Sequence, residues 1–377
     1  MPDLSLSPGD LLFYLFLIYI FAFLVQQCFY WILFIRIAFK KGHDLKTASG
    51  GISVVICARN EYENLKKNLP LILEQDYPEF EVVVVNWASD DDSAFLLSKM
   101  ADRYPNLKIV EIRENLNFFS GKKFPLSIGI KSAKNEIIIV TDAGCRPVSR
   151  NWLALMGAEF KGSAEVVLGY GAYEKQKGVL NKLIRFDTVH IAIRYLSSAL
   201  AGIPFMGVGR NMAYMKSLFI RNKGFISHYR IHSGDDDLFI NKVAKKSNTR
   251  VMLDPDSFMI SEQRQNFQHW MIQKKNQSWT TRFYRPGHRI LFAAYSLSIF
   301  LLYFLFVILL VMNYNPVLIL PVFFVRLITQ VFLFHRCMAK LNEKDLIWLV
   351  PFYEVALLVI ETFTSVSNLV TKPNKWK

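Results

Sequence analysis

Charged and polar side chains gather at four places in the sequence where they could do chemistry. Three of these places directly follow apolar runs, at residues 57–61, 86–89 and 141–144. The fourth is a run of three acids at residues 235–237. A carboxylate can take a proton from a hydroxyl group or hold a divalent cation through its oxygens. The run of acids also suits a helix N-terminus, where exposed amides favour Asp, so a purely structural role is the alternative.

These places lie at the ends of predicted secondary-structure elements. The pattern predicts strands at 52–57, 81–86, 108–112 and 136–141, and helices from 60 to about 74, at 92–104 and at 122–133. The strands are continuously apolar, as expected when helices cover both faces of a sheet. The alternation predicts an α/β, doubly wound and mostly parallel sheet, which binds ligands outside the carboxyl ends of its strands. The first strand lacks a Gly-x-Gly-x-x-Gly fingerprint and no Walker lysine loop occurs, which argues against a nicotinamide enzyme or a P-loop ATPase.

Both ends of the 377-residue chain carry long apolar segments, at 11–39, 290–312, 317–334 and 346–366. A bilayer core is spanned by about 20 such residues. A cleaved signal peptide is the weaker interpretation of the first segment, because Asp3 and Asp10 stand where basic residues are expected. The predicted division is an anchor at 1–41, a cytosolic catalytic domain at 42–263, a basic and aromatic interfacial segment at 264–289, and a C-terminal membrane region at 290–377.

Basic residues give the orientation of these segments. The first ten residues carry no Lys or Arg, whereas Lys40, Lys41 and Lys46 follow the first span, which places the domain in the cytosol. The last segment contains Glu354 and Glu361 and precedes a lysine-rich tail (Lys372, Lys375 and Lys377). We therefore expect three true spans and a last helix that is interfacial or re-entrant, with a cytosolic carboxyl terminus. The alternative is a fourth span whose glutamates face protein.

The net charge of +14 is explained by a membrane surface and a pyrophosphate substrate rather than by nucleic acid. The four cysteines have no metal-ligand spacing, so neither a disulfide nor a zinc site is expected.

An ordered series of motifs between residues 51 and 289 resembles glycosyltransferase family 2, a group with the GT-A fold, and in particular its membrane-bound bacterial-type members. The series consists of Ile52-Ser53-Val54-Val55-Ile56-Cys57-Ala58-Arg59-Asn60-Glu61, Glu81-Val82-Val83-Val84-Val85-Asn86, Ser120-Gly121-Lys122-Lys123, Thr141-Asp142-Ala143-Gly144, Gly207-Val208-Gly209-Arg210-Asn211 and Gly234-Asp235-Asp236-Asp237. The resemblance implies an inverting transferase that moves a sugar from a nucleotide-sugar donor to a lipid-linked or glycan acceptor. It also implies an integral protein of a bacterial inner membrane, in contact with membrane lipids.

The resemblance also assigns roles to single residues. Asp236 matches the catalytic carboxylate, with Asp235 as the second candidate. Asp142 matches the first acid of an Asp-x-Asp signature, which would hold Mg²⁺ or Mn²⁺, but Gly144 replaces the second acid, so weak metal dependence is expected. The expected donor-binding residues are Ala58, Arg59, Asn60, Glu61, Asn86, Trp87, Lys122, Asp142, Gln273 and Lys274. The expected acceptor-side residues are Gly209, Arg210, Asn211 and Asp237.

Two further positions depart from the family pattern. Asn86-Trp87 stands where an acid usually contacts the nucleotide base, and Trp87 could either stack on a base or fill the empty space. Of a Gln-x-x-Arg-Trp motif only Gln273 remains, although Lys274 could meet the diphosphate. These departures leave a second hypothesis, a catalytically silent homologue that binds a nucleotide or glycan or supports a partner. A transporter is disfavoured because ionisable residues in the apolar segments are few.

Overall fold

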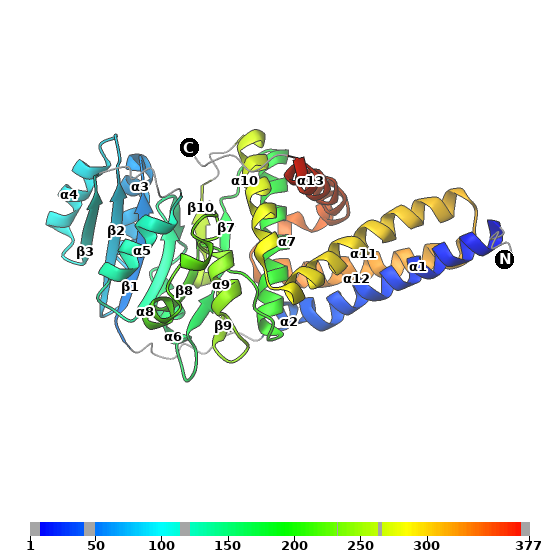
Figure 1. Cartoon of the computed structure of the whole chain (residues 1–377), viewed down its shortest axis with the longest axis horizontal. Helices are drawn as coiled ribbons and strands as arrows, with labels where there is room; N and C mark the ends of the chain where they lie inside the picture. Colours follow the sequence, from blue (N-terminus) through cyan, green and yellow to red (C-terminus); the bar gives the residue numbers. More distant parts are fainter. Residues whose placement is uncertain (1–7, 41–49, 114–120, 232, 263–265, 371–377) are drawn as a thin grey trace.

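The structure, a computed structural model, describes residues 8–40, 50–113, 121–231, 233–262 and 266–370. An α/β domain lies at one end of the molecule, and long helices extend away from it at the other (Figure 1). Two helices, α7 (Val179–Leu200) and α10 (Phe267–Thr280), stand between these parts. Several residues used in the sequence analysis lie outside the described ranges: Asp3, Lys41, Lys46, Ser120, Lys372, Lys375 and Lys377, with residues 264–265.

The main sheet has seven strands in the order β3-β2-β1-β4-β8-β6-β9. The four predicted strands form its parallel half, each with bounds within one residue of the prediction: β1 (Ile52–Ala58), β2 (Phe80–Trp87), β3 (Leu107–Ile112) and β4 (Ile137–Asp142). Cys57 is the register partner of Asp142, and Ala58 is the partner of Asn86. The polar segments that follow these strands therefore emerge at one edge of the sheet.

Helices cover both faces of this half, which explains the continuous valine runs. Val54 and Val82 pack in a core with α3 (Tyr62–Leu73), α4 (Ser93–Arg103) and α6 (Trp152–Ala158). Val55 and Val83, one position along each strand, pack in a second core with α5 (Lys123–Ser132) and α7. Successive residues of a strand point to opposite faces, so one run of valines supplies both cores.

The remaining strands are short, and the sequence analysis did not predict them. β8 (Met212–Met215) is antiparallel to β4 and to β6 (Val166–Leu168), and β6 pairs in parallel with β9 (Thr249–Val251). A separate three-stranded sheet has the order β5-β10-β7. Its strands are β5 (Cys145–Pro147), β10 (Met259–Ser261) and β7 (Gly171–Tyr173). The seven-stranded main sheet is therefore mixed, and its parallel strands lie at the predicted site.

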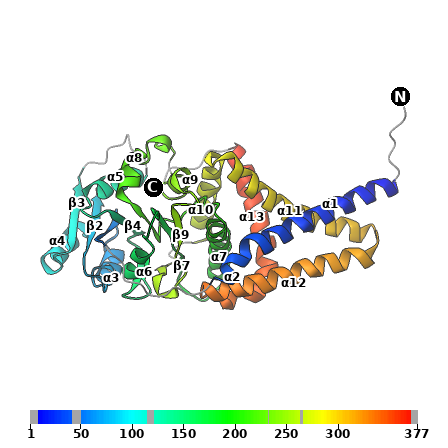
Figure 2. The ribbon, with the colours of Figure 1, turned by 90° about the horizontal axis from the view of Figure 1, so that it is seen from below.

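The short helices of the domain are α8 (Lys216–Arg221), η2 (Ile226–His228), α9 (Asp237–Val243), η3 (Pro255–Ser257) and η4 (Thr281–Phe283). The longer α7 is buried along much of its length and belongs to the same core as the membrane-side helices. It therefore joins the sheet to the apolar ends of the chain (Figure 2).

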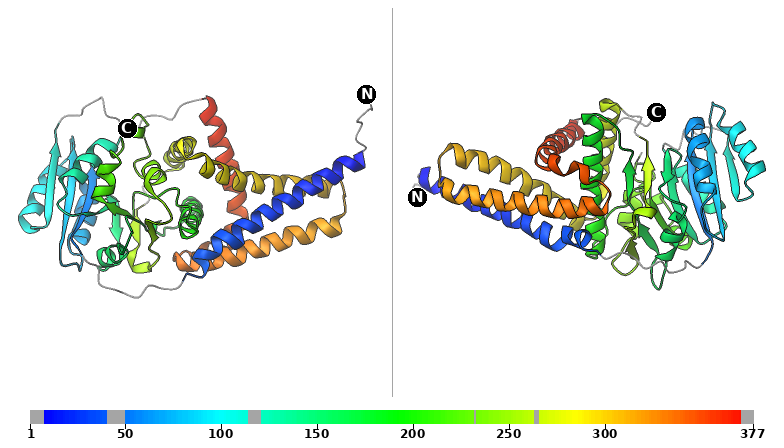
Figure 3. Two further views of the ribbon diagram at one scale, coloured as in Figure 1. Left: turned by 60° about the horizontal axis from the view of Figure 1, so that its bottom comes forward. Right: turned by 180° about the vertical axis from the view of Figure 1, so that it is seen from behind.

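Within the described part of the chain, four helical segments are long and apolar enough to cross a membrane. The first comprises α1 (Pro8–Cys28), a π-helical turn η1 (Phe29–Phe34) and α2 (Ile35–Ala38). The others are α11 (Pro286–Val311), α12 (Pro316–Lys340) and α13 (Val350–Val370), which follows η5 (Lys344–Leu349). α1, α11 and α12 run side by side, whereas α13 lies across the end of that bundle nearest the domain (Figure 3). This crosswise placement is compatible with the predicted interfacial helix, although length and composition also allow a fourth span.

The acids of α13 face protein. Both carboxylate oxygens of Glu354 accept hydrogen bonds from Nη2 of Arg326 on α12, at 2.8 and 2.7 Å, and both side chains are fully or almost fully buried. Glu361 lies 3.8 Å from the Arg194 guanidinium of α7. Pairing offsets the cost of removing these charges from water. The glutamates therefore tie α13 to the bundle and to the domain.

Candidate active site

The end of β4 and the start of α5 bring two of the predicted donor-binding residues together. The Lys122 ammonium, just before α5, forms an ion pair with the Asp142 carboxylate at the end of β4. Burial opposes the charge on Asp142, but the nearby Lys122 and Arg210 outweigh it and hold its pKa below the usual range. Burial likewise opposes the charge on Lys122, but Asp142 and Asp235 raise its pKa. Lys122 therefore stays cationic at any physiological pH.

Arg210 provides a second cation near Asp142. Thr141, next to Asp142 on β4, donates a hydrogen bond from Oγ1 to the carbonyl oxygen of Arg210 at 2.8 Å. The guanidinium lies 4.3 Å from the centre of the Tyr173 ring, and Nη1 donates to the Ala172 carbonyl oxygen at 3.5 Å. The described residues show no ion pair for this guanidinium, so its charge can act on an anion at the sheet edge.

The loops after β1 and β2 are locked to each other. Asn60, with a left-handed φ of 55°, donates from its backbone N–H to Ser89 Oγ at 3.0 Å, and Asn60 Oδ1 accepts from the Asp90 N–H at 2.7 Å. The Arg59 guanidinium lies 5.1 Å from the centre of the Trp87 ring. Trp87 is half-buried against Arg59, so one of its faces is already covered by a cation. Its stacking on a nucleotide base remains a prediction.

Asn86 does not offer a free side chain to a ligand. It is 2% exposed, its Nδ2 donates to both carboxylate oxygens of Glu111 at 3.1 Å, and its Oδ1 accepts from Ser89 at 2.6 Å. Asn86 therefore holds an acid of the neighbouring strand β3. The sequence analysis did not single out Glu111, because only the sheet register places it beside Asn86. Of the remaining donor-side residues, Ala58 is buried at the end of β1 and Glu61 is half-buried ahead of α3.

The three adjacent acids have three different environments. Asp236 caps α9: its Oδ1 accepts from the Asp237 N–H at 2.7 Å, and its Oδ2 accepts from the Gly209 N–H at 2.9 Å. Asp237 is buried and accepts hydrogen bonds from Thr280 Oγ1 and Tyr284 Oη, which fasten α9 to the end of α10. Asp235 acts electrostatically on Lys122, the partner of Asp142. The helix-capping interpretation is thus correct for Asp236, and it leaves the carboxylate available for chemistry.

Asp236 has an unusual acidity. Burial raises its pKa, the neighbouring carboxylates of Asp235 and Asp237 raise it further, and the two backbone N–H donors lower it, with the result at about 7. Such a carboxylate changes its protonation state near neutral pH. A general base works best with a pKa close to the operating pH.

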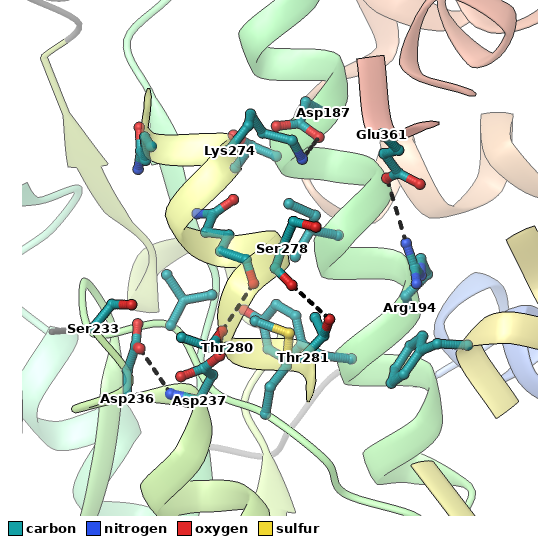
Figure 4. A pocket seen from close by; sticks show the side chains of 18 of the residues that line it. Asp187, Arg194, Ser233, Asp236, Asp237, Lys274, Ser278, Thr280, Thr281 and Glu361 are labelled. Atoms are coloured by element: carbon teal, nitrogen blue, oxygen red, sulfur yellow. Dashed lines mark hydrogen bonds and ion pairs between the residues drawn. The ribbon is translucent and has the colours of Figure 1, made fainter. Parts of the chain in front are cut away.

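Asp236 and Asp237 line a cavity of about 500 Å³, which extends from the N-terminus of α9 to the membrane-side helices (Figure 4). α7, α10, α11 and α13 supply its other walls. Apolar side chains such as Phe205, Val208 and Phe292 line it together with polar ones. Asp235 is not among the lining residues. Burial raises the pKa of Asp237 as well, but its carboxylate already accepts hydrogen bonds from Thr280 and Tyr284. Asp236 is therefore the candidate base of this run.

Polar contacts between helices close the far side of this cavity. Arg194 of α7 meets Glu361 of α13 (Figure 4). The hydroxyl oxygens of Ser278 on α10 and Ser365 on α13 lie 3.5 Å apart. The last apolar segment of the chain therefore forms a wall of the site, which the sequence analysis did not anticipate.

Gln273 and Lys274 also line this cavity, and neither takes part in the ion pair between Lys122 and Asp142. Nζ of Lys274 donates to Asp187 Oδ1 of α7 at 2.7 Å, and both side chains are buried. The Lys274 charge is thus already compensated by a residue that the sequence analysis did not mention. A role of Lys274 at the diphosphate remains a prediction.

The expected acceptor-side residues separate into different roles. Gly209 orients Asp236 through its backbone N–H, whereas Arg210 lies near Asp142 and also lines the cavity. Asn211 is completely buried: its Nδ2 donates to the carbonyl oxygens of Tyr170 and Ser257 at 2.9 and 2.8 Å, and its Oδ1 accepts from Trp152 at 3.0 Å. The prediction that Asn211 contacts an acceptor is wrong, because this side chain has no accessible surface. It instead joins the two sheets beneath the site.

The residues around Asp142 do not fit a divalent cation well. Its carboxylate is paired with Lys122, Gly144 contributes no side chain, and the described residues contain no cluster of three His, Cys, Asp or Glu side chains. Cys145 is not a substitute, because burial raises the pKa of its thiol to about 11 and keeps it protonated. Hard cations prefer several oxygen ligands, and the charge at this edge is supplied by Lys122 and Arg210 instead.

Comparisons with known proteins agree with this architecture. The family model described as glycosyl transferase family 21 matches residues 12–371. The resemblance seen in the sequence, to family 2, is consistent with this match at the level of a GT-A-type glycosyltransferase. The mannosyltransferase PcManGT from Pyrobaculum calidifontis, solved with GDP-Man and Mn²⁺, superposes with a TM-score of 0.60 at 18% identity, over 93% of this chain and 97% of that one. The GT-A fold is thereby confirmed.

Curated relatives match over shorter stretches. The poly-β-1,6-N-acetyl-D-glucosamine synthase of Staphylococcus epidermidis is 31% identical over 93 residues, which is 25% of this chain and 21% of that protein. The glycosyltransferase AglE of Haloferax volcanii is 30% identical over 104 residues, which is 27% of this chain and 33% of that protein. The alignments thus span between a fifth and a third of these relatives.

Proposed function

Because the chain belongs to glycosyl transferase family 21 and is therefore a transferase, we propose that it is an inverting glycosyltransferase. In this proposal it moves a sugar from a nucleotide-diphosphate donor to a hydroxyl group of a lipid-linked or polysaccharide acceptor. Asp236 is the general base. The donor lies at the edge of the sheet, and the acceptor lies in the cavity lined by Asp236.

The observation that carries the proposal is the environment of Asp236. Its carboxylate lines a cavity large enough for a substrate group, two backbone N–H groups fix its orientation, and its pKa lies at about 7. A helix cap alone would need none of the buried negative charge that Asp235 and Asp237 add to this position. Proton acceptance explains the combination, since a base of this pKa is ionised in about half of the molecules at neutral pH.

The reaction follows in one displacement. The acceptor hydroxyl oxygen forms a bond to the anomeric carbon while its proton passes to Asp236. On the opposite side, the bond between the anomeric carbon and the diphosphate oxygen breaks, and the electron pair leaves with the nucleoside diphosphate. A single displacement inverts the anomeric configuration.

Lys122 and Arg210 support the departure of the diphosphate. Both cations lie near Asp142 at the sheet edge, and positive groups placed where negative charge develops lower the barrier. A bound divalent cation, as in the solved relative, would supply the same charge stabilisation. Because the Asp142 surroundings are a poor set of ligands, we assign this role to the two side chains.

The acceptor is proposed to reach the site from the membrane. α11 and α13, two of the helices that are apolar enough to span a bilayer, form walls of the cavity together with α7 and α10. A membrane-borne acceptor could thus bring its hydroxyl to Asp236 without leaving the bilayer surface. The basic residues Arg36 and Lys40 lie at the domain end of the first span, which supports a cytosolic location of the domain. In a bacterial cell, the membrane in this proposal is the inner membrane.

The proposal is tested with protein purified in detergent or nanodiscs. Release of nucleotide would be followed with a panel of UDP-, GDP- and dTDP-sugars, in the presence of extracted membrane lipids or glycan acceptors. The anomeric configuration of the product would then be read by NMR. We expect one donor class to be consumed, with inversion, and Asp236→Asn to abolish it. A product of retained configuration, or full turnover by Asp236→Asn, would refute the assigned mechanism.

A further inference from the structure

Two neighbouring lysines at the start of α5 point to different places. Lys122 meets Asp142 at the donor side, whereas the Lys123 side chain is 1% exposed and reaches under the loop that precedes α9. Nζ of Lys123 donates to the carbonyl oxygens of His228, Ile231 and Ser233, at 2.8, 2.6 and 2.7 Å. An ammonium has three N–H donors, so these three carbonyls use all of them.

Burying the Lys123 ammonium costs free energy unless other groups compensate its charge. Among the described residues, Lys123 obtains this compensation from three backbone carbonyls and forms no direct ion pair. All three carbonyls belong to residues 228–233, and Ser233 is followed directly by Gly234 and the three acids. Gly234 itself has a left-handed φ of +96°, and a Cβ there would lie 2.5 Å from Leu238 Cδ1. The chain therefore enters α9 through a tightly defined turn, with Lys123 beneath it.

We propose that Lys123 is a positioning residue, which holds the backbone of His228, Ile231 and Ser233 in place and thereby sets the orientation of Asp236, three residues after Ser233. The proposal rests on the proposed function in one respect, namely that Asp236 is the base. Lys123 contacts neither the cavity nor the Lys122–Asp142 pair, so its effect passes through the backbone. Adjacent lysines thus serve the two halves of one reaction, with Lys122 at the leaving group and Lys123 at the base.

The position of Lys123 also makes the loop sensitive to alkaline pH. The charged groups that act on its ammonium are Asp235, Asp236 and Asp237, and the His228 ring lies close to it. Burial lowers the pKa of Lys123 to about 8, although the three carboxylates partly counter this effect. A neutral amine has two N–H donors for three carbonyls, so above this pH one carbonyl loses its partner. The turnover number should then fall as the pH rises through about 8, whereas donor affinity should not.

The test compares Lys123→Met with Lys131→Met, an exposed lysine of the same helix. For Lys123→Met we expect kcat to fall about 10²-fold, as for other small misplacements of a catalytic group, while the dissociation constant of the donor stays within about twofold. Lys131→Met should match the wild type in both. An unchanged kcat in Lys123→Met would overturn the proposal, and so would an equal loss in Lys131→Met.

Two readouts keep this test separate from the proposed function. Hydrogen exchange at the amides of residues 228–236 needs no substrate, and it should accelerate in Lys123→Met but not in Lys131→Met. Unchanged exchange would overturn the positioning role even if the protein transferred no sugar. If Lys123→Met does not fold, the pH profile of the wild type decides. A kcat that falls above about pH 8 with unchanged donor affinity supports the role, and a flat profile to pH 10 contradicts it.

Discussion

Replacing Asp236 by Asn should abolish transfer and yet stabilise the protein at alkaline pH. Folding moves the pKa of this carboxyl from 3.8 to about 7, because of burial and the adjacent Asp235 and Asp237. A shift of about three units corresponds to roughly 4 kcal/mol, at 1.36 kcal/mol per unit. Since the folded-state pKa is raised, the native state is favoured below the unfolded pKa and loses this stability as the pH rises from about 4 to 7. Above pH 7 the wild type carries the whole penalty.

Replacing Asp236 by Asn removes the titrating carboxyl group, but the substitution has a cost of its own. The Asp236 carboxylate accepts from two backbone N–H groups, at Gly209 and Asp237, and Asn has one acceptor oxygen. One buried donor then loses its partner, which costs about 1–3 kcal/mol. The net gain at pH 8 is therefore about 1–3 kcal/mol. It should become a loss of about 1–3 kcal/mol below about pH 3, where the wild-type carboxyl is protonated in both states and only the lost hydrogen bond counts.

The assay combines two measurements on the same preparations. Thermal unfolding at pH 4.5, 6 and 8 should show Asp236→Asn gaining on the wild type as the pH rises. Nucleotide release at pH 8 should fall by about 10²–10⁴-fold, the usual contribution of a general base. Asp235→Asn is the matched control, because Asp235 does not line the cavity and should retain more activity. A difference in melting temperature that is independent of pH would refute the raised pKa, and more than a tenth of wild-type turnover would refute the base.

Three further outcomes are expected. Wild-type activity should depend only weakly on Mn²⁺ or Mg²⁺, or need the ion at millimolar concentration, and Gly144→Asp, for which a Cβ would lie in ordinary contact 3.5 Å from the Asn64 amide, should tighten this requirement; micromolar dependence in the wild type would contradict the prediction. Glu354→Ala leaves the buried Arg326 unpaired and should cost about 3–5 kcal/mol of stability in detergent melts, whereas Glu361→Ala, at a longer and more exposed contact, should cost far less; equal losses would be inconsistent with this. A reporter fused after the last residue should be active on the cytosolic side, and activity only outside would restore four spans.

The local pattern of the sequence was sufficient for the parallel half of the sheet. Runs such as Ile52–Ala58 are apolar at every position, which is informative because a strand covered on both faces needs no solvent-facing side chain. The polar residues that end these strands, including Asp142, were predictable because they directly follow the continuous apolar runs. Membrane helices were equally recognisable, since a span requires about 20 apolar residues in one uninterrupted segment. Three-residue strands such as β6 carry too little pattern to be recognised.

The residues of the candidate site were partly predictable by type but not by partner. Asp236 and Lys122 follow from their motifs, whereas the use of Asn211 as a buried link between sheets does not. No local pattern indicated that Lys274 would pair with Asp187, because these residues are 87 positions apart.

What the sequence alone determined about this protein is a set of local facts: strands that end in polar residues, helices that are apolar throughout, and three acids at a helix start. The tertiary structure decided which of these meet. It turned Lys122 toward Asp142 and Lys123 toward the loop before α9, and it laid α13 against α7 and α10 as a wall of the cavity. The physical reason is that residue type and hydrophobic periodicity are properties of adjacent positions in the sequence. Charge pairing, burial and the raised pKa of Asp236 arise instead from residues that folding alone brings into contact.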